Sequence, residues 1–452
     1  MPFIPHTEKD IQEMLSTLNV SDISALFDEI PPSIIFEKFK SIPDGINEIE
    51  LMRLMKSRAK RDEIELNFMG AGAYEHHIPA AVWDITTRGE FMTAYTPYQA
   101  EASQGTLQLL YEYQTMMANL TGMEVSNASL YDGASALAEA VLMAVRLKKS
   151  SDPIVLIPEN IHPHYRQTVE SIIKNQHIKI KDLPIHPETG NIIFPPKNEL
   201  SENIAALIIP QPNFFGILED CDALTNAAHE NNILVIGAVN PLSLALLKEP
   251  GMWGNKGADI VCGELQPFGI PLASGGPYAG FLCTKMANVR QMPGRIVGMT
   301  TDRENKRGFT LTLQAREQHI RRGKAMSNIC TNQGLLVTAA TIYLSLLGFE
   351  GLKRVAACCH ENANYLYNKL LEIKFIKPLF VHQPAFFHEF AVTFDEPIDL
   401  KKIVSQLAHQ KILAGLELDI KKYPNSLLIC TTETKTKEDL DCFIDAIKKI
   451  QL

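Results

Sequence analysis

Short runs of branched aliphatic residues recur through the middle of this chain, and segments with helical spacing separate them. A strand with one solvent-exposed face alternates polar and apolar residues, whereas these runs are apolar almost throughout. Such runs are typical of parallel strands that are covered on both faces. We therefore predict an α/β fold in which helices cover both sides of a mostly parallel sheet. Strands are predicted at 154–157, 204–209, 233–239 and 258–262, and helices at 133–148, 165–175 and 223–231.

The two ends of the chain have other patterns. Residues 1–66 contain apolar residues at helical spacing and predict an arm of three helices, the second of which follows Ser21 and stops at Pro31. The apolar run from Gly334 to Phe349 predicts a core helix, because it is too short and too polar for a membrane span. We expect an N-terminal helical arm at 1–66, a large α/β domain at 67–333, and the core helix with a small C-terminal α+β domain at 334–452.

Composition excludes several classes of partner. The net charge of −9 argues against nucleic acid or an anionic membrane, since both require a basic surface. The eight cysteines form no Cys-x-x-Cys pair and no signal peptide precedes them, so a reducing, cytoplasmic setting is expected. The thirteen histidines form no His-Glu-x-x-His pattern, and we expect no metal site.

A loop rich in proline and glycine lies between two apolar runs, at residues 264–281. Its three prolines and four glycines predict a rigid, tightly folded connection. The loop resembles the lysine loop of large pyridoxal phosphate (PLP) enzymes, and more closely that of glycine dehydrogenase, the P-protein of the glycine cleavage system. In that family the loop lysine forms the Schiff base with PLP. The corresponding position here is Gln266, whose amide cannot form one.

Three further segments resemble the same family, at residues 95–108, 129–139 and 311–333. The likeness runs from the N-terminus to at least residue 350 and corresponds to the N-terminal half of the family, which in some members is a separate first subunit. It implies PLP fold type I, with a large α/β domain and a small C-terminal domain. It also implies decarboxylation of glycine and transfer of the aminomethyl group to the lipoyl arm of the H-protein.

The PLP site that the resemblance implies is degenerate in this chain. Gly133 to Ser135 open a helix directly after a strand and keep the form of a phosphate cradle. The acid that should contact the pyridinium nitrogen is missing, because residues 234–240 contain no carboxylate. With Gln266, two requirements fail together. We therefore expect PLP to be bound by an obligate second subunit, in an α2β2 assembly.

A polar segment around Pro97 is the candidate contribution to the partner's active site. Its phenols, hydroxyls and carboxylate could hydrogen-bond glycine or the cofactor phosphate and exclude water, although an interdomain turn would also explain them. Short donors at 327–331 could cap the following helix or reach the partner's PLP. The candidates are Tyr95, Thr96, Tyr98, Gln99 and Glu101 for the catalytic contribution, and Ser327, Asn328 and Thr331 for the cofactor contact.

Two other interpretations stay open at this point. The chain could be a self-sufficient PLP enzyme that uses Lys256 or Lys285, which flank the loop. It could instead be a non-catalytic regulatory or scaffold protein on a degenerate PLP fold. Gln266 argues against the first interpretation, and the intact segment 95–108 argues against the second.

Overall fold

The computed structural model describes residues 6–35, 41–382, 385–395 and 398–450. The chain divides into two compact units, Met1–Glu63 and Ile64–Leu452. In the first unit, α1 (Glu8–Leu18) begins at a capping box of Thr7 and Asp10, and α2 (Glu48–Arg61) begins after Asn47. The helix expected after Ser21 is instead a short 3-10 helix, Ile23–Phe27, whose first turn is capped by Asp22. A second 3-10 turn, Pro32–Ile34, follows.

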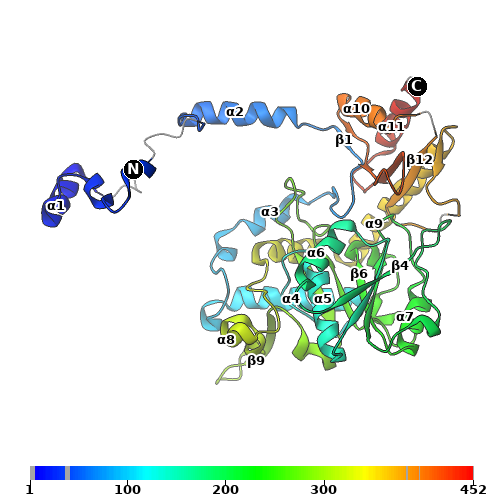
Figure 1. The fold of residues 1–452 in the computed structure, drawn as a ribbon, viewed down its shortest axis with the longest axis horizontal. Helices are drawn as coiled ribbons and strands as arrows, with labels where there is room; N and C mark the ends of the chain where they lie inside the picture. Colours follow the sequence, from blue (N-terminus) through cyan, green and yellow to red (C-terminus); the bar gives the residue numbers. More distant parts are fainter. Residues whose placement is uncertain (1–5, 36–40, 383–384, 396–397, 451–452) are drawn as a thin grey trace. The chain divides into compact units, whose positions relative to one another are not determined.

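A seven-stranded sheet forms the centre of the second unit (Figure 1). The five strands β3 to β7 are parallel, β8 pairs antiparallel with β7, and β2 pairs antiparallel with β8. The prediction of a mostly parallel sheet is therefore confirmed. In spatial order the strands are β2 (Val125–Ser126), β8 (Gly280–Thr284), β7 (Ile260–Glu264), β6 (Leu234–Val239), β5 (Ile204–Gln211), β3 (Ile154–Pro158) and β4 (Lys179–Leu183).

Helices cover both faces of this sheet. Along β5, Ala206 and Ile208 pack in a core with side chains of α5 (Gly133–Lys148) and α6 (Pro163–Ile173). Leu207 and Ile209 belong to a second core, which includes α4, α7 and the first half of α9. The alternation of β5 between two apolar cores explains why its sequence is apolar throughout. The helices on the second face are α4 (Gln104–Thr121), α7 (Cys221–Glu230) and α9 (Gly334–Leu371).

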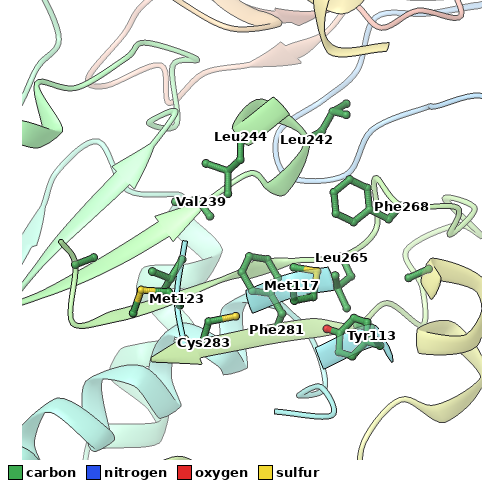
Figure 2. Close-up of a cluster of buried hydrophobic side chains, with 14 of the residues drawn as sticks. Tyr113, Met117, Met123, Val239, Leu242, Leu244, Leu265, Phe268, Phe281 and Cys283 are labelled. Carbon is green, nitrogen blue, oxygen red and sulfur yellow. The ribbon is translucent and has the colours of Figure 1, made fainter. Parts of the chain in front are cut away.

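The proline- and glycine-rich loop is anchored in the second core (Figure 2). Leu265 is fully buried beside Met117 of α4, and Phe268 is fully buried in the same apolar cluster, where its ring stacks on Tyr343 of α9. The indole nitrogen of Trp83 in α3 (Ala80–Thr86) donates to the carbonyl of Gly269 at 3.0 Å. Only the tip of the loop, around residues 271–278, is substantially exposed. Buried anchors therefore keep the start of the loop rigid, as its composition predicts.

The C-terminal part contains a separate antiparallel sheet of four strands. Its core packs the second half of α9 against this sheet and against α10 and α11. The helix α9 is longer than the predicted core helix and breaks at Gly348, whose φ is +59°. The division of this unit at residue 333 stays a prediction. The elements are β11 (Ile376–Pro378), β12 (Glu389–Phe394), β15 (Ser426–Cys430) and β14 (Leu416–Glu417) in spatial order, with α10 (Leu400–His409) and α11 (Lys437–Lys449).

Two polar stretches of the sequence fold into strands that were not predicted. Ile296–Thr301 (β9) and Arg307–Thr312 (β10) form an antiparallel hairpin, and α8 (Gln318–Arg321) follows. The short strand β1 (Leu66–Asn67) pairs in parallel with β13 (Ile412–Leu413), which ties the start of the second unit to its C-terminal part. Among the described residues, α9 is the one helix that is long and apolar enough to cross a membrane, and half of its most apolar window is buried inside the protein.

Candidate functional site

Gln266 lies in the turn directly after β7 and is only 1% exposed. Its side-chain carbonyl accepts from the backbone N–H of Tyr74 at 2.8 Å, and its amide nitrogen donates to the carbonyls of Tyr74 and Ile270 at 2.8 and 2.9 Å. Both halves of the amide are therefore used. The side chain clamps the segment around Tyr74 to the loop, so the residue at the lysine position has a structural role.

Glu264, the last residue of β7, lies beside Gln266 and was not predicted as a site residue. Its carboxyl accepts from the backbone N–H of Gly133 at 2.9 Å and from those of Gln266 and Ala279 at 3.2 Å each. Burial raises the pKa of this carboxyl to about 8, while the three N–H donors act in the opposite direction. The sequence shows that a carboxyl follows a predicted buried strand, and this could have marked Glu264 as a site residue. It does not show the contact of Glu264 with Gly133.

A second buried carboxyl, Glu389 at the start of β12, closes the other side of the site. It accepts from the backbone N–H of Ala71 and from the hydroxyl of Tyr74, both at 2.7 Å. Burial raises the pKa of Glu389 to about 7. The imidazole of His162 is bonded to the carbonyl of Ala71 at 2.8 Å, and burial lowers its pKa. Residues 71–74 thus connect the turn after β7 with β12 and with His162 through these side chains.

A cavity of about 80 Å³ remains between these groups. Ligand pockets for molecules of cofactor size usually measure about 300–1,000 Å³. The end of β6 contributes Ala238, Val239 and Asn240 to the lining, and residues 234–240 supply no carboxylate. The cavity therefore lacks the lysine, the pyridinium acid and the volume that PLP needs, and the residues present do not fit this cofactor.

The two flanking lysines lie at the opposite edge of the sheet. Lys285 follows β8 and donates to Asp259, which immediately precedes β7, at 2.8 Å. Lys256 is exposed and lies three residues before Asp259. Glu264 and Gln266 are at the other end of β7, so neither lysine reaches the cavity. This placement disfavours a self-sufficient PLP enzyme based on either residue.

The residues predicted to face a partner lie elsewhere, on an exposed surface. Tyr95 is 83% exposed and Tyr98 is 52% exposed, and Gln99 and Glu101 are also exposed. None of these four, nor Thr96, lines the cavity beside Glu264. Their position is open to a second chain, which agrees with the expected role and does not test it.

Two of the predicted groups meet within this surface. The hydroxyls of Thr96 and Thr331 are 3.0 Å apart, although 235 positions separate them. The hydroxyl of Ser327 accepts from the backbone N–H of Ile329 at 3.0 Å and so stabilises its own turn, while Asn328 is exposed. The structure thus joins the two candidate segments, 95–101 and 327–331, through one side-chain pair.

A buried arginine supports the same surface from below. Arg295 is 2% exposed and donates to the hydroxyl of Tyr98 at 2.9 Å. Its guanidinium carbon lies 5.3 Å from the centre of the Tyr98 ring, and its Nε is 3.6 Å from Glu317. The sequence did not single out Arg295. Its contacts fix the ring of Tyr98 in place.

Among the described residues, His76, Cys359 and Glu433 are close enough together to hold a metal ion. They already bond to one another, because Nδ1 of His76 lies 2.8 Å from Glu433 and the Cys359 thiol donates to the same carboxylate at 3.2 Å. The bond to His76 lowers the pKa of Glu433 to about 2 against the effect of burial. We interpret this group as a hydrogen-bonded link between residue 76 and the C-terminal part.

The fold is that of PLP-dependent enzymes of fold type I, with the lysine position occupied by glutamine. The cystine C-S lyase C-DES, solved with glycine covalently linked to its PLP cofactor, has the same fold (TM-score 0.62, 15% identity, 86% of this chain and 97% of that chain). A family model described as "Glycine cleavage system P-protein" matches residues 1–447. This chain belongs to the glycine cleavage system P-protein family.

Relatives within the family are similar over their whole length. A probable glycine dehydrogenase (decarboxylating) subunit 1 from Nitrosomonas europaea is 58% identical over 453 residues, which is 99% of each chain. The crystal structure of a glycine decarboxylase (P-protein) of the glycine cleavage system, in inhibitor-bound form, matches with a TM-score of 0.89 and 40% identity over 100% of both chains.

Proposed function

We propose that this chain is the first of two subunits of a glycine dehydrogenase (decarboxylating) and that the second subunit holds the PLP. The observation that carries the proposal is the lysine position itself: the Gln266 amide is fully bonded within the chain, and the Glu264 carboxyl beside it occupies the N–H of Gly133. The chain is similar over its full length to a protein described as subunit 1, and this description supports the existence of a second subunit of the same enzyme. When bound in the partner, PLP supplies the electron sink for loss of CO2 from glycine.

This chain contributes polar side chains from its exposed surface to the active site of the second subunit. Tyr95 and Glu101 present a hydroxyl and a carboxylate on exposed backbone, where a second chain can cover them. Arg295 fixes Tyr98, and the contact between Thr96 and Thr331 fixes the neighbouring segment. Groups held rigidly in this way can bind the small substrate and exclude water without reorganising during the reaction.

The remaining parts of the proposal concern the assembly. We place glycine, the second subunit in an α2β2 complex, and the lipoylated H-protein that receives the aminomethyl group among its partners. We propose a cytoplasmic location, which agrees with the eight cysteines being free thiols. No feature of the structure favours a regulatory or scaffold protein over this assignment.

Co-expression with a candidate second subunit tests the proposal. The complex should exchange the carboxyl group of glycine with labelled CO2, and each chain alone should show no exchange. The visible absorbance of bound PLP should follow the second subunit and be absent from this chain. A stoichiometric PLP adduct on this chain, trapped with borohydride and located by peptide mapping, would contradict the assignment.

A further inference from the structure

The start of α5 is the place where this chain differs most from what binding of a PLP phosphate requires. A helix N-terminus has free backbone N–H groups and the positive end of the helix dipole, and it is a common binding position for phosphate. In this chain two carboxyls occupy the start of α5. Asp132 caps the helix by accepting from the N–H of Ser135. The N–H of Gly133, the first residue of α5, donates to the Glu264 carboxyl, 131 positions away. The backbone N–H groups of Gln266 and Ala279 donate to the same carboxyl.

We propose that the Glu264 carboxyl is a built-in occupant of the anion-binding position at the start of α5, and that it keeps small anions, a cofactor phosphate among them, out of this chain. The inference deepens the proposed function, because it explains how a chain of this fold stays free of PLP. Three N–H donors from three different segments converge on one side chain, which is the arrangement that an anion would otherwise satisfy.

The packing around Gly133 supports this assignment. A Cβ atom at this position would overlap the Tyr165 hydroxyl and would lie 2.9 Å from the backbone nitrogen of Glu264. Side chains and backbone therefore press directly on the helix start. The adjoining cavity of about 80 Å³ corresponds to a few water molecules, and Glu264 is part of its lining. A phosphate group in this cavity would find the three N–H donors already occupied by Glu264.

Removal of the carboxyl should open the position. Glu264→Ala deletes the acceptor and leaves the three N–H donors facing a space that joins the existing cavity. Inorganic phosphate can then accept from those donors. A ligand that binds the folded state raises the melting temperature, and above its Kd the gain grows with the logarithm of the ligand concentration, whereas a ligand that cannot bind has no effect.

The test is thermal unfolding of the full chain with inorganic phosphate, compared with chloride at equal ionic strength. We expect Glu264→Ala to gain about 2–4 °C at saturating phosphate and the native chain to gain nothing. Glu389→Ala is the matched control, because it removes from the same cavity a buried carboxyl that accepts from Ala71 and Tyr74 and not from α5, and it should not respond. Glu264→Ser, whose hydroxyl can still accept one bond, serves as a second variant if the alanine protein does not fold.

An equal phosphate effect on the native chain would overturn the proposal, and so would no effect on whichever Glu264 variant is folded. Loss of folding in both variants, even at saturating phosphate, would also overturn the proposal. If phosphate can take the place of the Glu264 carboxyl, the chain must fold without that carboxyl when phosphate is present. This measurement involves neither the second subunit nor turnover. Failure of glycine–CO2 exchange in the complex would therefore refute the proposed function without affecting this result.

Discussion

Gln266 has a structural role at the position where PLP enzymes carry their catalytic lysine. The lysine that this loop carries in PLP enzymes needs a free amine, whereas the amide here is fully engaged with Tyr74 and Ile270. A lysine could replace the donors of this amide but could not accept from the N–H of Tyr74. Restoring the lysine would therefore break a structural contact.

Gln266→Lys should consequently be destabilising and inactive on its own. It leaves a buried N–H without an acceptor and places an ammonium group in a site that is 1% exposed, which should lower the unfolding free energy by about 3 kcal/mol or more. Chemical denaturation measures the loss, with Gln410→Lys on the exposed end of α10 as control. Glycine decarboxylation by the isolated mutant chain would show that the site is far less degenerate than the structure indicates.

Glu389 predicts a pH dependence of stability. Burial raises its folded-state pKa from 4.5 to about 7, so the folded chain binds this proton more tightly than the unfolded chain. The unfolding free energy should therefore fall as pH rises from about 4.5 to about 7, by at most about 1.4 kcal/mol per pH unit, and level off above. Glu389→Gln keeps the acceptor for Ala71 and should flatten this part of the profile.

The measurement is the denaturant midpoint of both proteins between pH 4 and 8. Glu264 titrates in an overlapping range, since its pKa is raised to about 8, and it should produce a residual slope in the Glu389→Gln protein. Identical profiles for native and Glu389→Gln chains would mean that Glu389 is ionised in the folded state at pH 5.

At the scale of elements, the loop 264–281 depends on its apolar anchors. Phe268 is fully buried and its ring stacks on Tyr343 of α9, whereas Leu265 is fully buried beside Met117 of α4. These contacts hold the first turn of the loop on α4, and through it they hold Gln266 against Tyr74. The apolar side chains of Leu265 and Phe268 (Figure 2) thus hold the segment that carries Gln266.

Phe268→Ala should therefore disturb more than the core. Truncation of a buried phenylalanine costs about 3–5 kcal/mol, and the loosened loop should also expose the amides around Gln266 to solvent exchange. Calorimetry and hydrogen exchange measure the two effects, with Met252→Ala on an exposed turn as the control. Normal protection of residues 264–270 in a destabilised Phe268→Ala protein would show that the loop is held by other contacts.

At the scale of the whole molecule, the exposed surface around Pro97 carries the polar groups that we propose complete the active site of the second subunit. Arg295 contacts Tyr98 and Thr331 contacts Thr96, whereas Tyr95 and Glu101 are exposed. Both a contribution to a partner's site and a structural turn agree with these contacts, so the role of Tyr95 and Glu101 stays a prediction.

Tyr95→Phe and Glu101→Gln test this interpretation in the complex with the second subunit. Each removes one polar group at nearly constant volume, so assembly and bound PLP should be retained. Loss of one such contact in a water-poor site should lower turnover about 30- to 1000-fold, which corresponds to about 2–4 kcal/mol. Glu417→Gln, on the exposed strand β14, is the control.

The outcome separates a functional surface from a structural turn. A structural turn would give weakened assembly or a lower melting temperature with normal turnover in the complex that remains. Full turnover with intact assembly in both variants would remove Tyr95 and Glu101 from the site.

The parts of the fold that sequence could predict are those in which local pattern follows burial. Strands such as β5 are apolar on both faces, so their sequence alone identifies them. The edge strand β4 and the hairpin of β9 and β10 are partly exposed and polar, and their sequences resemble loops. Their pairing is decided by neighbours that are distant along the chain.

The same distinction holds for the site. Residue identity alone determined that Gln266 cannot form a Schiff base and that residues 234–240 lack an acid, because these are statements about functional groups. Only the tertiary structure decided that Glu264 lies on the start of α5, since that contact joins segments 131 positions apart. The absence of a lysine or an acid at one position is visible in the sequence itself. The residue that occupies the start of α5 instead depends on how the sheet, the loop and the helix pack together.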